Sequence, residues 1–95
     1  MKTMLDIVKE RLPEGIEIAS VKEDRSKYEV TLTDGEYSSK CWVNKTYAPN
    51  MYERAADSAI YNAMAGIAID RGDIATGKAF LAKIAELGKD DGDEA

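Results

Sequence analysis

The first part of the chain carries apolar residues at the spacing of a helix. Over about three turns they fall on one face: Leu5, Val8 and Leu12. Thr3 stands where an N-terminal cap is needed, with Asp6 three residues later to complete a capping box. Pro13 and Gly15 do not continue a helix. We therefore predict a short helix between Thr3 and Pro13.

The next segment has the two-residue period of β-strands. Ile16, Ile18 and Val21 open an extended stretch, and a polar turn follows it. After this turn, apolar residues at alternate positions mark a half-buried strand: Tyr28, Val30 and Leu32. Asp34-Gly35 is a residue pair favoured in two-residue hairpin turns, and it leads into a return strand. The pattern predicts a meander of three antiparallel strands.

A two-residue turn determines which residues face one another across the hairpin. The core face of the return strand then carries Tyr37, Ser39, Cys41 and Val43. On the opposite face Glu29 meets Lys40 as an opposite-charge pair. Lys27 meets Trp42 there as a cation–π pair. These compatible pairs favour this register.

Two further helices are predicted in the second half of the chain. Asn50 is placed to cap the first of them, whose small and apolar residues share a face: Tyr52, Ala56, Ala59, Ile60, Ala63 and Ile67. Gly72 ends this helix, Asp73 caps the next one and Gly88 ends it. The predicted fold class is α+β: a two-layer domain in which helices cover a three-stranded antiparallel meander, in the order α-β-β-β-α-α. This domain occupies residues 1–88, and residues 89–95 form an acidic tail that we expect to be disordered.

Over residues 3–69 the order helix, three strands, helix resembles the double-stranded-RNA-binding domain. Residues 53–60 read ERAADSAI, which is similar to the Ala-Ala-x-x-Ala spacing of the packing helix in that family. The resemblance implies RNA contacts from lysines at the start of the last helix and from a histidine-bearing loop between the first two strands. Here residues 50–54 read NMYER and residues 23–27 read EDRSK, so most of those RNA-binding residues are missing.

The same order of elements, the small size and the acidity are also similar to some phage-encoded inhibitors, including certain anti-CRISPR proteins. This similarity lies in the order of elements and not in a sequence motif. It implies a protein that blocks a host enzyme or defence system, although a fold does not by itself define a function.

Composition narrows the chemistry that the chain can perform. Its 95 residues carry a formal net charge of −5 and include no histidine, the commonest general base and metal ligand. The single cysteine, Cys41, has no histidine to activate it and cannot form an internal disulfide, so we expect a reducing, cytoplasmic location. No apolar run is long enough to cross a membrane. We therefore expect no enzyme activity, no metal or cofactor, and no membrane partner.

Residues 72–79 read GDIATGKA, which is close to the phosphate-binding loop G-x-x-x-x-G-K-[ST]. That loop follows a strand and ends in a hydroxyl group that holds Mg²⁺. Here a helix precedes the segment, and Ala79 stands in the place of the hydroxyl residue. We interpret the match as coincidence.

Trp42 is the main candidate for a binding residue. Strand alternation points its indole away from the core, and an exposed indole is a common anchor of protein interfaces. The candidate partner-binding surface is completed by residues on the same face or beside it: Lys40, Lys27, Glu29, Thr31 and Tyr47. Alternatively, Trp42 packs under the loop of residues 47–49, or a register slip by one residue buries it. We expect a protein partner that binds this face and the third helix.

Two other functions stay open. A nucleic-acid-binding module would use basic residues distributed along the chain, although the acidic net charge disfavours nucleic acid: Lys2, Lys9, Arg11, Arg25, Lys27 and Arg54. A homodimer or larger structural oligomer would use the third helix, which carries apolar residues on two sides, or an edge of the sheet. Salt dependence of binding and light scattering separate these classes.

Overall fold

A computed structural model describes the backbone of residues 2–92 and the side chains of residues 2–87. Its elements are α1 (Met4–Arg11), β1 (Glu17–Glu23), β2 (Lys27–Thr33), β3 (Ser38–Asn44), a 3₁₀ turn η1 (Pro49–Met51), α2 (Tyr52–Arg71) and α3 (Ile74–Gly92). The three strands are antiparallel and lie in the order β1-β2-β3. This arrangement confirms the predicted α+β fold and its order of elements. Residues 93–95 of the acidic tail lie outside the described residues.

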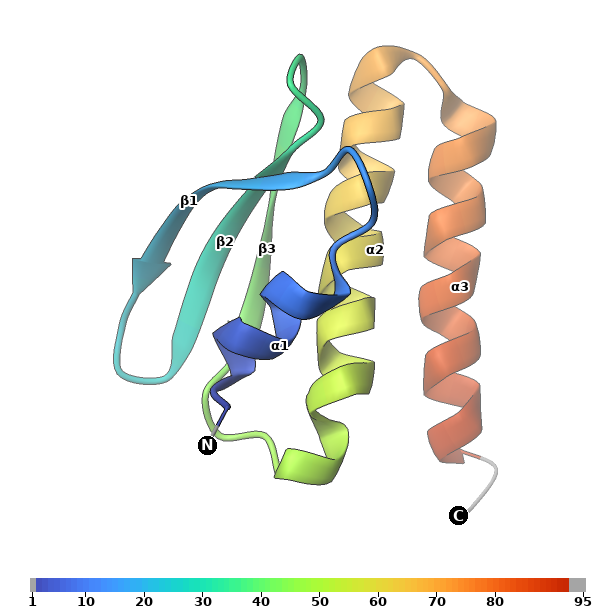
Figure 1. Ribbon diagram of the computed structural model, residues 1–95. Coiled ribbons are helices and arrows are strands. Elements are labelled where there is room, and N and C mark those ends of the chain that lie inside the picture. The colour runs from blue at the N-terminus through green and yellow to red at the C-terminus, as the bar shows by residue number, and fades with distance from the viewer. Residues whose placement is uncertain (1, 93–95) are drawn as a thin grey trace.

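The helices lie on one side of the sheet (Figure 1). α1 and α2 pack against one face of the sheet, and α3 packs against α2 on the side that points away from the strands. No described element covers the opposite face of the sheet. The sheet therefore has a covered face and an open face.

The capping box predicted for α1 is present. The Asp6 N–H donates to Thr3 Oγ1 at 3.2 Å, and the Thr3 N–H donates to the Asp6 carboxylate at 3.0 Å. At the other end of α1, Arg11 donates two hydrogen bonds to the Asp57 carboxylate of α2, at 2.7 and 2.8 Å. This two-pronged contact holds α1 on α2.

The turn between β2 and β3 is longer than the predicted two-residue turn. Residues 34–37 separate the two strands. The Asp34 carboxylate accepts hydrogen bonds from the N–H groups of Glu36 and Tyr37, at 2.9 and 2.8 Å. An aspartate that bonds the backbone two and three residues ahead closes a wider loop than a hairpin turn of the Asp-Gly type. The predicted turn is therefore wrong.

The longer turn shifts the register of the hairpin by two positions. Trp42 lies opposite Glu29 rather than Lys27, so the predicted cation–π pair is wrong. Lys27 instead lies opposite Asn44, and Lys40 lies diagonally from Glu29. Because side chains alternate with a period of two, this shift leaves every residue on its predicted face of the sheet.

α2 begins one residue later than its predicted cap implies. Asn50 lies inside the 3₁₀ turn that Pro49 begins, and α2 starts at Tyr52 without a side-chain cap. Proline is well suited to the first position of a helical turn, so the turn forms before Asn50 is reached. The predicted Asn50 cap is therefore wrong.

The connection between α2 and α3 follows the prediction. Gly72 ends α2 with a φ of 94°, which is the usual helix-ending conformation of glycine. Asp73 caps α3 by accepting a hydrogen bond from the Thr76 N–H at 3.1 Å. α3 then continues to Gly92, beyond Gly88, where the sequence predicted its end.

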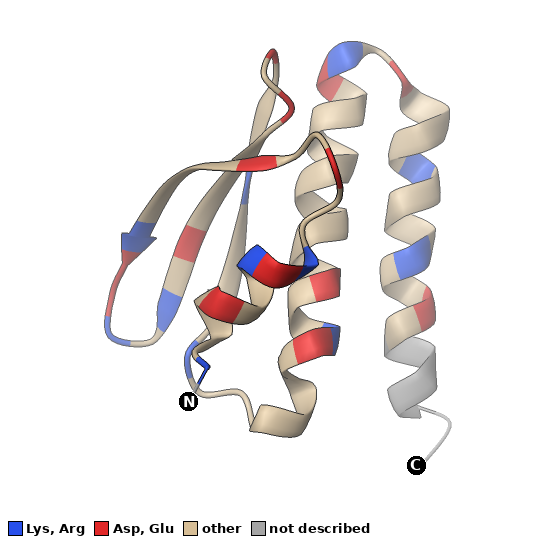
Figure 2. Cartoon of the chain, viewed as in Figure 1, with Lys and Arg blue, Asp and Glu red and all other residues tan. Residues whose placement is uncertain are grey.

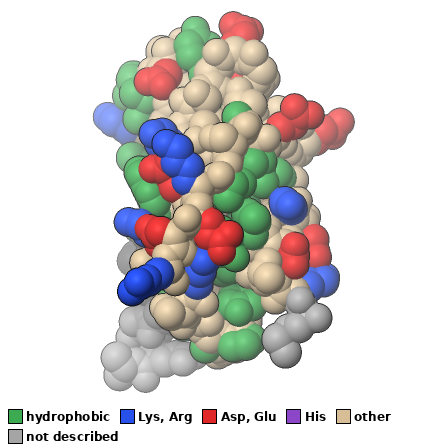
Figure 3. All heavy atoms as spheres, turned by 90° about the vertical axis from the view of Figure 1, so that its left-hand side faces the viewer, with side chains coloured by type: hydrophobic (Ala, Val, Ile, Leu, Met, Phe, Trp, Pro, Cys, Tyr) green, Lys and Arg blue, Asp and Glu red, His purple; other side chains and the backbone are tan. Residues whose placement is uncertain are grey.

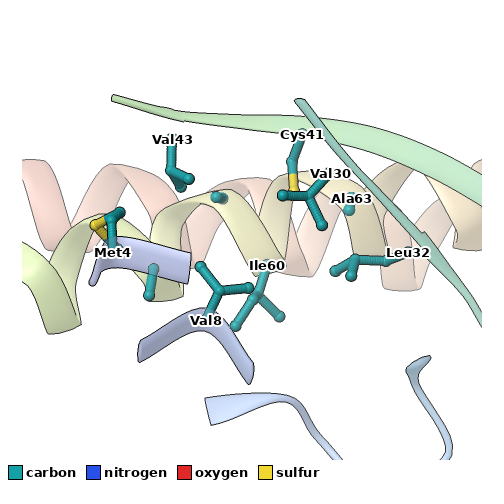
Figure 4. Packing of buried hydrophobic residues seen from close by; sticks show 10 residues of the cluster. Met4, Val8, Val30, Leu32, Cys41, Val43, Ile60 and Ala63 are labelled. Atoms are coloured by element: carbon teal, nitrogen blue, oxygen red, sulfur yellow. The ribbon is translucent and has the colours of Figure 1, made fainter. Parts of the chain in front are cut away.

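The core lies between the covered face of the sheet and the helices α1 and α2 (Figure 4). Val8 of α1 and Ile60 of α2 point toward each other below the strands. The buried cluster combines strand residues with the small residues of α2: Met4, Val8, Val30, Leu32, Cys41, Val43, Ala56, Ala59, Ile60 and Ala63. α2 approaches β3 closely at Gly66, where a Cβ atom would lie 2.2 Å from Ser39 Oγ. The small residues of α2 thus let the helix lie directly on the sheet.

Candidate protein-binding surface

The predicted surface residues of β2 and β3 share the open face of the sheet. Alternation along β2 places Lys27, Glu29 and Thr31 there, and alternation along β3 places Lys40 and Trp42 there. Trp42 is 48% exposed. Neither a register slip nor the loop of residues 47–49 buries this side chain.

Charges of both signs are mixed on the open face. Glu29 lies opposite Trp42 and forms ion pairs with Lys22 at 4.0 Å and with Lys40 at 3.9 Å. In Figure 3, which views the left-hand side of Figure 1, basic and acidic side chains are interspersed with hydrophobic ones. A surface with this pattern offers no continuous basic strip for a phosphate backbone.

Trp42 borders a first hollow on the side of β1 and β2. This hollow has a volume of about 230 Å³ and is otherwise lined by charged residues: Lys22, Glu23, Asp24, Lys27 and Glu29. Asp24 is held by the turn, since its carboxylate accepts hydrogen bonds from the Ser26 and Lys27 N–H groups at 2.8 and 2.9 Å. These bonds lower the pKa of Asp24. Asp24 therefore stays ionised at neutral pH among the mixed charges that line this hollow.

Trp42 also borders a groove that joins β3 to the two long helices. One part has a volume of about 390 Å³ and is lined by Trp42, Tyr47, Ala55, Ser58, Ala59, Asn62, Leu81 and Ile84. A second part of about 220 Å³ shares residues with the first and extends along the helices: Tyr47, Met51, Arg54, Ala55, Ser58, Ile84 and Leu87. We call the two parts together the Trp42 groove.

The Trp42 groove has apolar walls and a floor of small residues. Trp42 and Tyr47 form one side, and Leu81 and Ile84 of α3 form the other. Between them, α2 supplies small and polar side chains as the floor: Ala55, Ser58, Ala59 and Asn62. Among the described residues that line the groove, Arg54 carries a charge. The groove therefore combines aromatic and aliphatic side chains with hydroxyl and amide groups that can fix the orientation of a bound segment.

Sequence reasoning found the walls of the groove but not its floor. Trp42, Tyr47 and the third helix were all predicted to bind the partner, and the structure brings them together. Ser58 and Asn62 were missed. They are polar residues four positions apart on an alanine-rich helix, which places them on one side of α2. This spacing of two polar residues was the sequence signal that could have indicated a polar patch on α2.

Cys41 is fully buried in the core. Burial raises the pKa of its thiol to about 11, so the thiol is protonated at neutral pH. A buried, protonated thiol packs as a small apolar residue. Within the described residues, no group of three or more carboxylate or cysteine side chains is arranged to hold a metal ion.

Two of the basic residues considered for nucleic-acid binding, Arg11 and Lys2, are paired with carboxylates. Arg11 binds Asp57, which raises the pKa of the arginine. Lys2 forms an ion pair with Glu10 at 2.7 Å. Figure 2 shows basic and acidic positions distributed over the same elements. In the part of the chain with described structure, no helix has the length and apolar character needed to span a membrane.

No family model matches this chain, and comparisons with curated proteins and with solved structures find no match. The structure shows one helix, three antiparallel strands and further helices, and no match confirms the predicted resemblance to the double-stranded-RNA-binding domain. A function must therefore be argued from the surface itself.

Proposed function

We propose that this protein binds another protein through the Trp42 groove and the adjoining open face of the sheet. The observation that carries the proposal is the exposed indole of Trp42, which lines a groove together with Leu81 and Ile84 of α3. Tryptophan is enriched among the residues that dominate protein interfaces, because it buries a large area at little entropic cost. Leu81 of α3 faces the same groove and is 45% exposed.

The expected contribution of Trp42 follows from its exposed area. A tryptophan side chain can bury about 250 Å², so an exposed fraction of 48% leaves about 120 Å² for a partner to cover. At about 25 cal/mol per Å², covering that area contributes about 3 kcal/mol, or roughly a hundredfold in the dissociation constant. This value is typical of a dominant interface residue.

The proposed role is binding rather than catalysis. The single thiol of the chain is buried and protonated, and the groove offers apolar walls with hydroxyl and amide groups. The similarity of the element order to phage-encoded inhibitors extends the proposal to a cytoplasmic inhibitor whose partner is a host enzyme or defence protein. The mixed charges beside Trp42 support a protein partner over nucleic acid.

The first test is capture of partners from a nuclease-treated lysate at moderate salt. Three baits are compared: the wild type, Trp42→Ala, and Val21→Ala as a matched control. Val21 is an exposed apolar residue on β1 that does not line the Trp42 groove. The proposal expects one protein recovered by the wild type and by Val21→Ala, and lost with Trp42→Ala.

The recovered protein is then titrated against the wild type. The chain has a single tryptophan, so burial of Trp42 in the complex shifts its fluorescence emission to shorter wavelength. An unchanged emission together with equal affinity of Trp42→Ala would refute the proposed site. Recovery of nucleic acid in place of a protein, with affinity that falls steeply with salt, would instead support the RNA-binding alternative.

A further inference from the structure

The side of α3 that points away from α2 is exposed and largely apolar. α3 packs on α2 through Gly77, which is buried against Ile69, and through Phe80, which stacks on Tyr61 with ring centroids 6.0 Å apart. The residues on the opposite side of α3 are all exposed: Ile74, Ala75, Lys78, Ala82, Ala85 and Glu86. We call these six residues the outer face of α3.

This composition is unusual for the outward side of a surface helix. Such a helix normally carries polar and charged residues on the side that faces water. The outer face of α3 instead has alanines along its length and Ile74, which is 49% exposed, near its start. α3 therefore has apolar residues both toward α2 and away from it, which is the pattern of a helix with packing partners on both sides.

The two charged residues of the outer face have opposite signs. Lys78 and Glu86 make no ion pair within the described part of the chain. They are eight positions apart, or about 12 Å along the helix axis, which is too far for them to pair with each other. Ala82 lies midway between them. In Figure 2 the basic bands of α3 lie nearer its start and the acidic band farther along.

We propose that two copies of this chain pair antiparallel through the outer face of α3, about a two-fold axis at Ala82. In this arrangement each Lys78 meets the partner's Glu86, so two ion pairs form on either side of the axis. The alanines at the axis let the two helices approach to about 8 Å. A parallel pair would instead place Lys78 beside the partner's Lys78, which is repulsive.

The size of the outer face sets the strength of this dimer. The outer face spans 13 residues, from Ile74 to Glu86, so it is about 20 Å long and, with side chains, about 10 Å wide. The projected contact of about 200 Å² per copy is well below the roughly 800 Å² of a standard stable interface. The dimer therefore belongs to the weak, transient class, with a dissociation constant between about 1 µM and 1 mM.

The dimer is separate from the proposed binding site. Leu81 and Ile84, which line the Trp42 groove, lie beside the outer face and are not among its residues. Pairing through Ala82 thus leaves both grooves open. The dimer presents two copies of the groove to a partner, which goes beyond the function proposed above.

Sedimentation equilibrium between about 10 µM and 1 mM tests the proposal with a charge exchange. The wild type is expected to dimerise over this range. Either single change, Lys78→Glu or Glu86→Lys, puts two like charges at each of the two contacts between the copies. Each is therefore expected to raise the dissociation constant of the dimer at least about tenfold. The double variant Lys78→Glu/Glu86→Lys restores opposite charges and is expected to regain the wild-type constant.

A mixture of the two single variants, Lys78→Glu and Glu86→Lys, is the most specific test of the proposed pairing. In a mixed pair every contact joins opposite charges, so the mixture is expected to form a heterodimer tighter than either variant alone. Both replaced side chains are exposed, so we expect the variants to keep the fold. Circular dichroism checks this expectation. A wild type that stays monomeric to about 1 mM overturns the proposal. A dimer that none of the exchanges alters also overturns it, because the copies must then meet elsewhere, such as along β3.

Discussion

The contrast between a buried and an exposed leucine tests the fold and the groove together. Leu32 of β2 is 0% exposed in the core, whereas Leu81 of α3 is 45% exposed at the wall of the Trp42 groove. Leu32→Ala removes buried methyl groups and leaves a cavity, so we expect a loss of about 3–5 kcal/mol in the free energy of unfolding. Leu81→Ala removes a side chain that is half exposed and opens onto the groove, so we expect a loss of about 1 kcal/mol.

The two variants are compared by urea unfolding followed by circular dichroism, and by thermal melting. For a domain of this size each kcal/mol lowers Tm by about 4–8 °C, so Leu32→Ala should lower it by at least about 12 °C. Leu81→Ala should lower it by less than about 8 °C. Equal losses of unfolding free energy in the two variants would refute the assignment of Leu81 to an exposed groove wall. Leu81 would then be covered in solution, and the groove wall would be part of a core.

Four further predictions follow from local contacts. Gly72→Ala should lower stability by about 1 kcal/mol in urea unfolding, because its φ of 94° strains any other residue; an equal stability would contradict the helix-end geometry. Gly66→Ala should also destabilise, despite the higher helix propensity of alanine, because its Cβ meets Ser39; a second change, Ser39→Gly, should relieve part of the loss. Hydrogen bonds from Thr76 lower the pKa of Asp73 in the folded protein. The ionised carboxylate therefore stabilises the fold at pH values above the pKa that Asp73 has in the unfolded chain, and this stabilisation is lost as the pH falls through its lowered pKa in the folded protein. Asp73→Asn should therefore flatten the acid side of a stability-against-pH curve. The buried thiol of Cys41 should resist alkylation at pH 8 in the folded protein. The free energy of unfolding should fall as the pH rises from 9 toward about 11, because over this range the Cys41 thiol ionises in the unfolded chain but not yet in the folded protein. Cys41→Ala should remove that part of the slope.

The elements that the sequence predicts well are those with local signals. The bonds between Thr3 and Asp6 join residues three positions apart, and the Gly72–Asp73 junction needs only the adjacent turns. The faces of β2 and β3 follow from alternation along each strand, which is why Trp42 was placed on the open face even with the wrong turn. Short-range signals thus fix the elements and the faces that they present.

The features that the sequence does not predict depend on distant contacts. Asp34 suits a two-residue turn, but its carboxylate also pairs with Arg71 at the end of α2, which lies over the Tyr37 ring at 5.6 Å. This contact joins the hairpin to a helix far along the chain, and no local pattern indicates it. The floor of the Trp42 groove depends in the same way on how closely α2 and α3 pack.

The positions of the exposed hydrophobic residues bear on whether the Trp42 groove is a binding site. Single exposed hydrophobic residues are normal on a protein surface, whereas contiguous ones mark interaction sites. Among the described residues the large exposed ones are Val21, Trp42, Met51, Ile69, Ile74 and Leu81. Trp42, Met51 and Leu81 line the same groove although they come from β3, η1 and α3. Three segments meet at this groove with exposed apolar side chains, and this clustering is the reason that we propose the groove, rather than the scattered exposed residues, as the docking site.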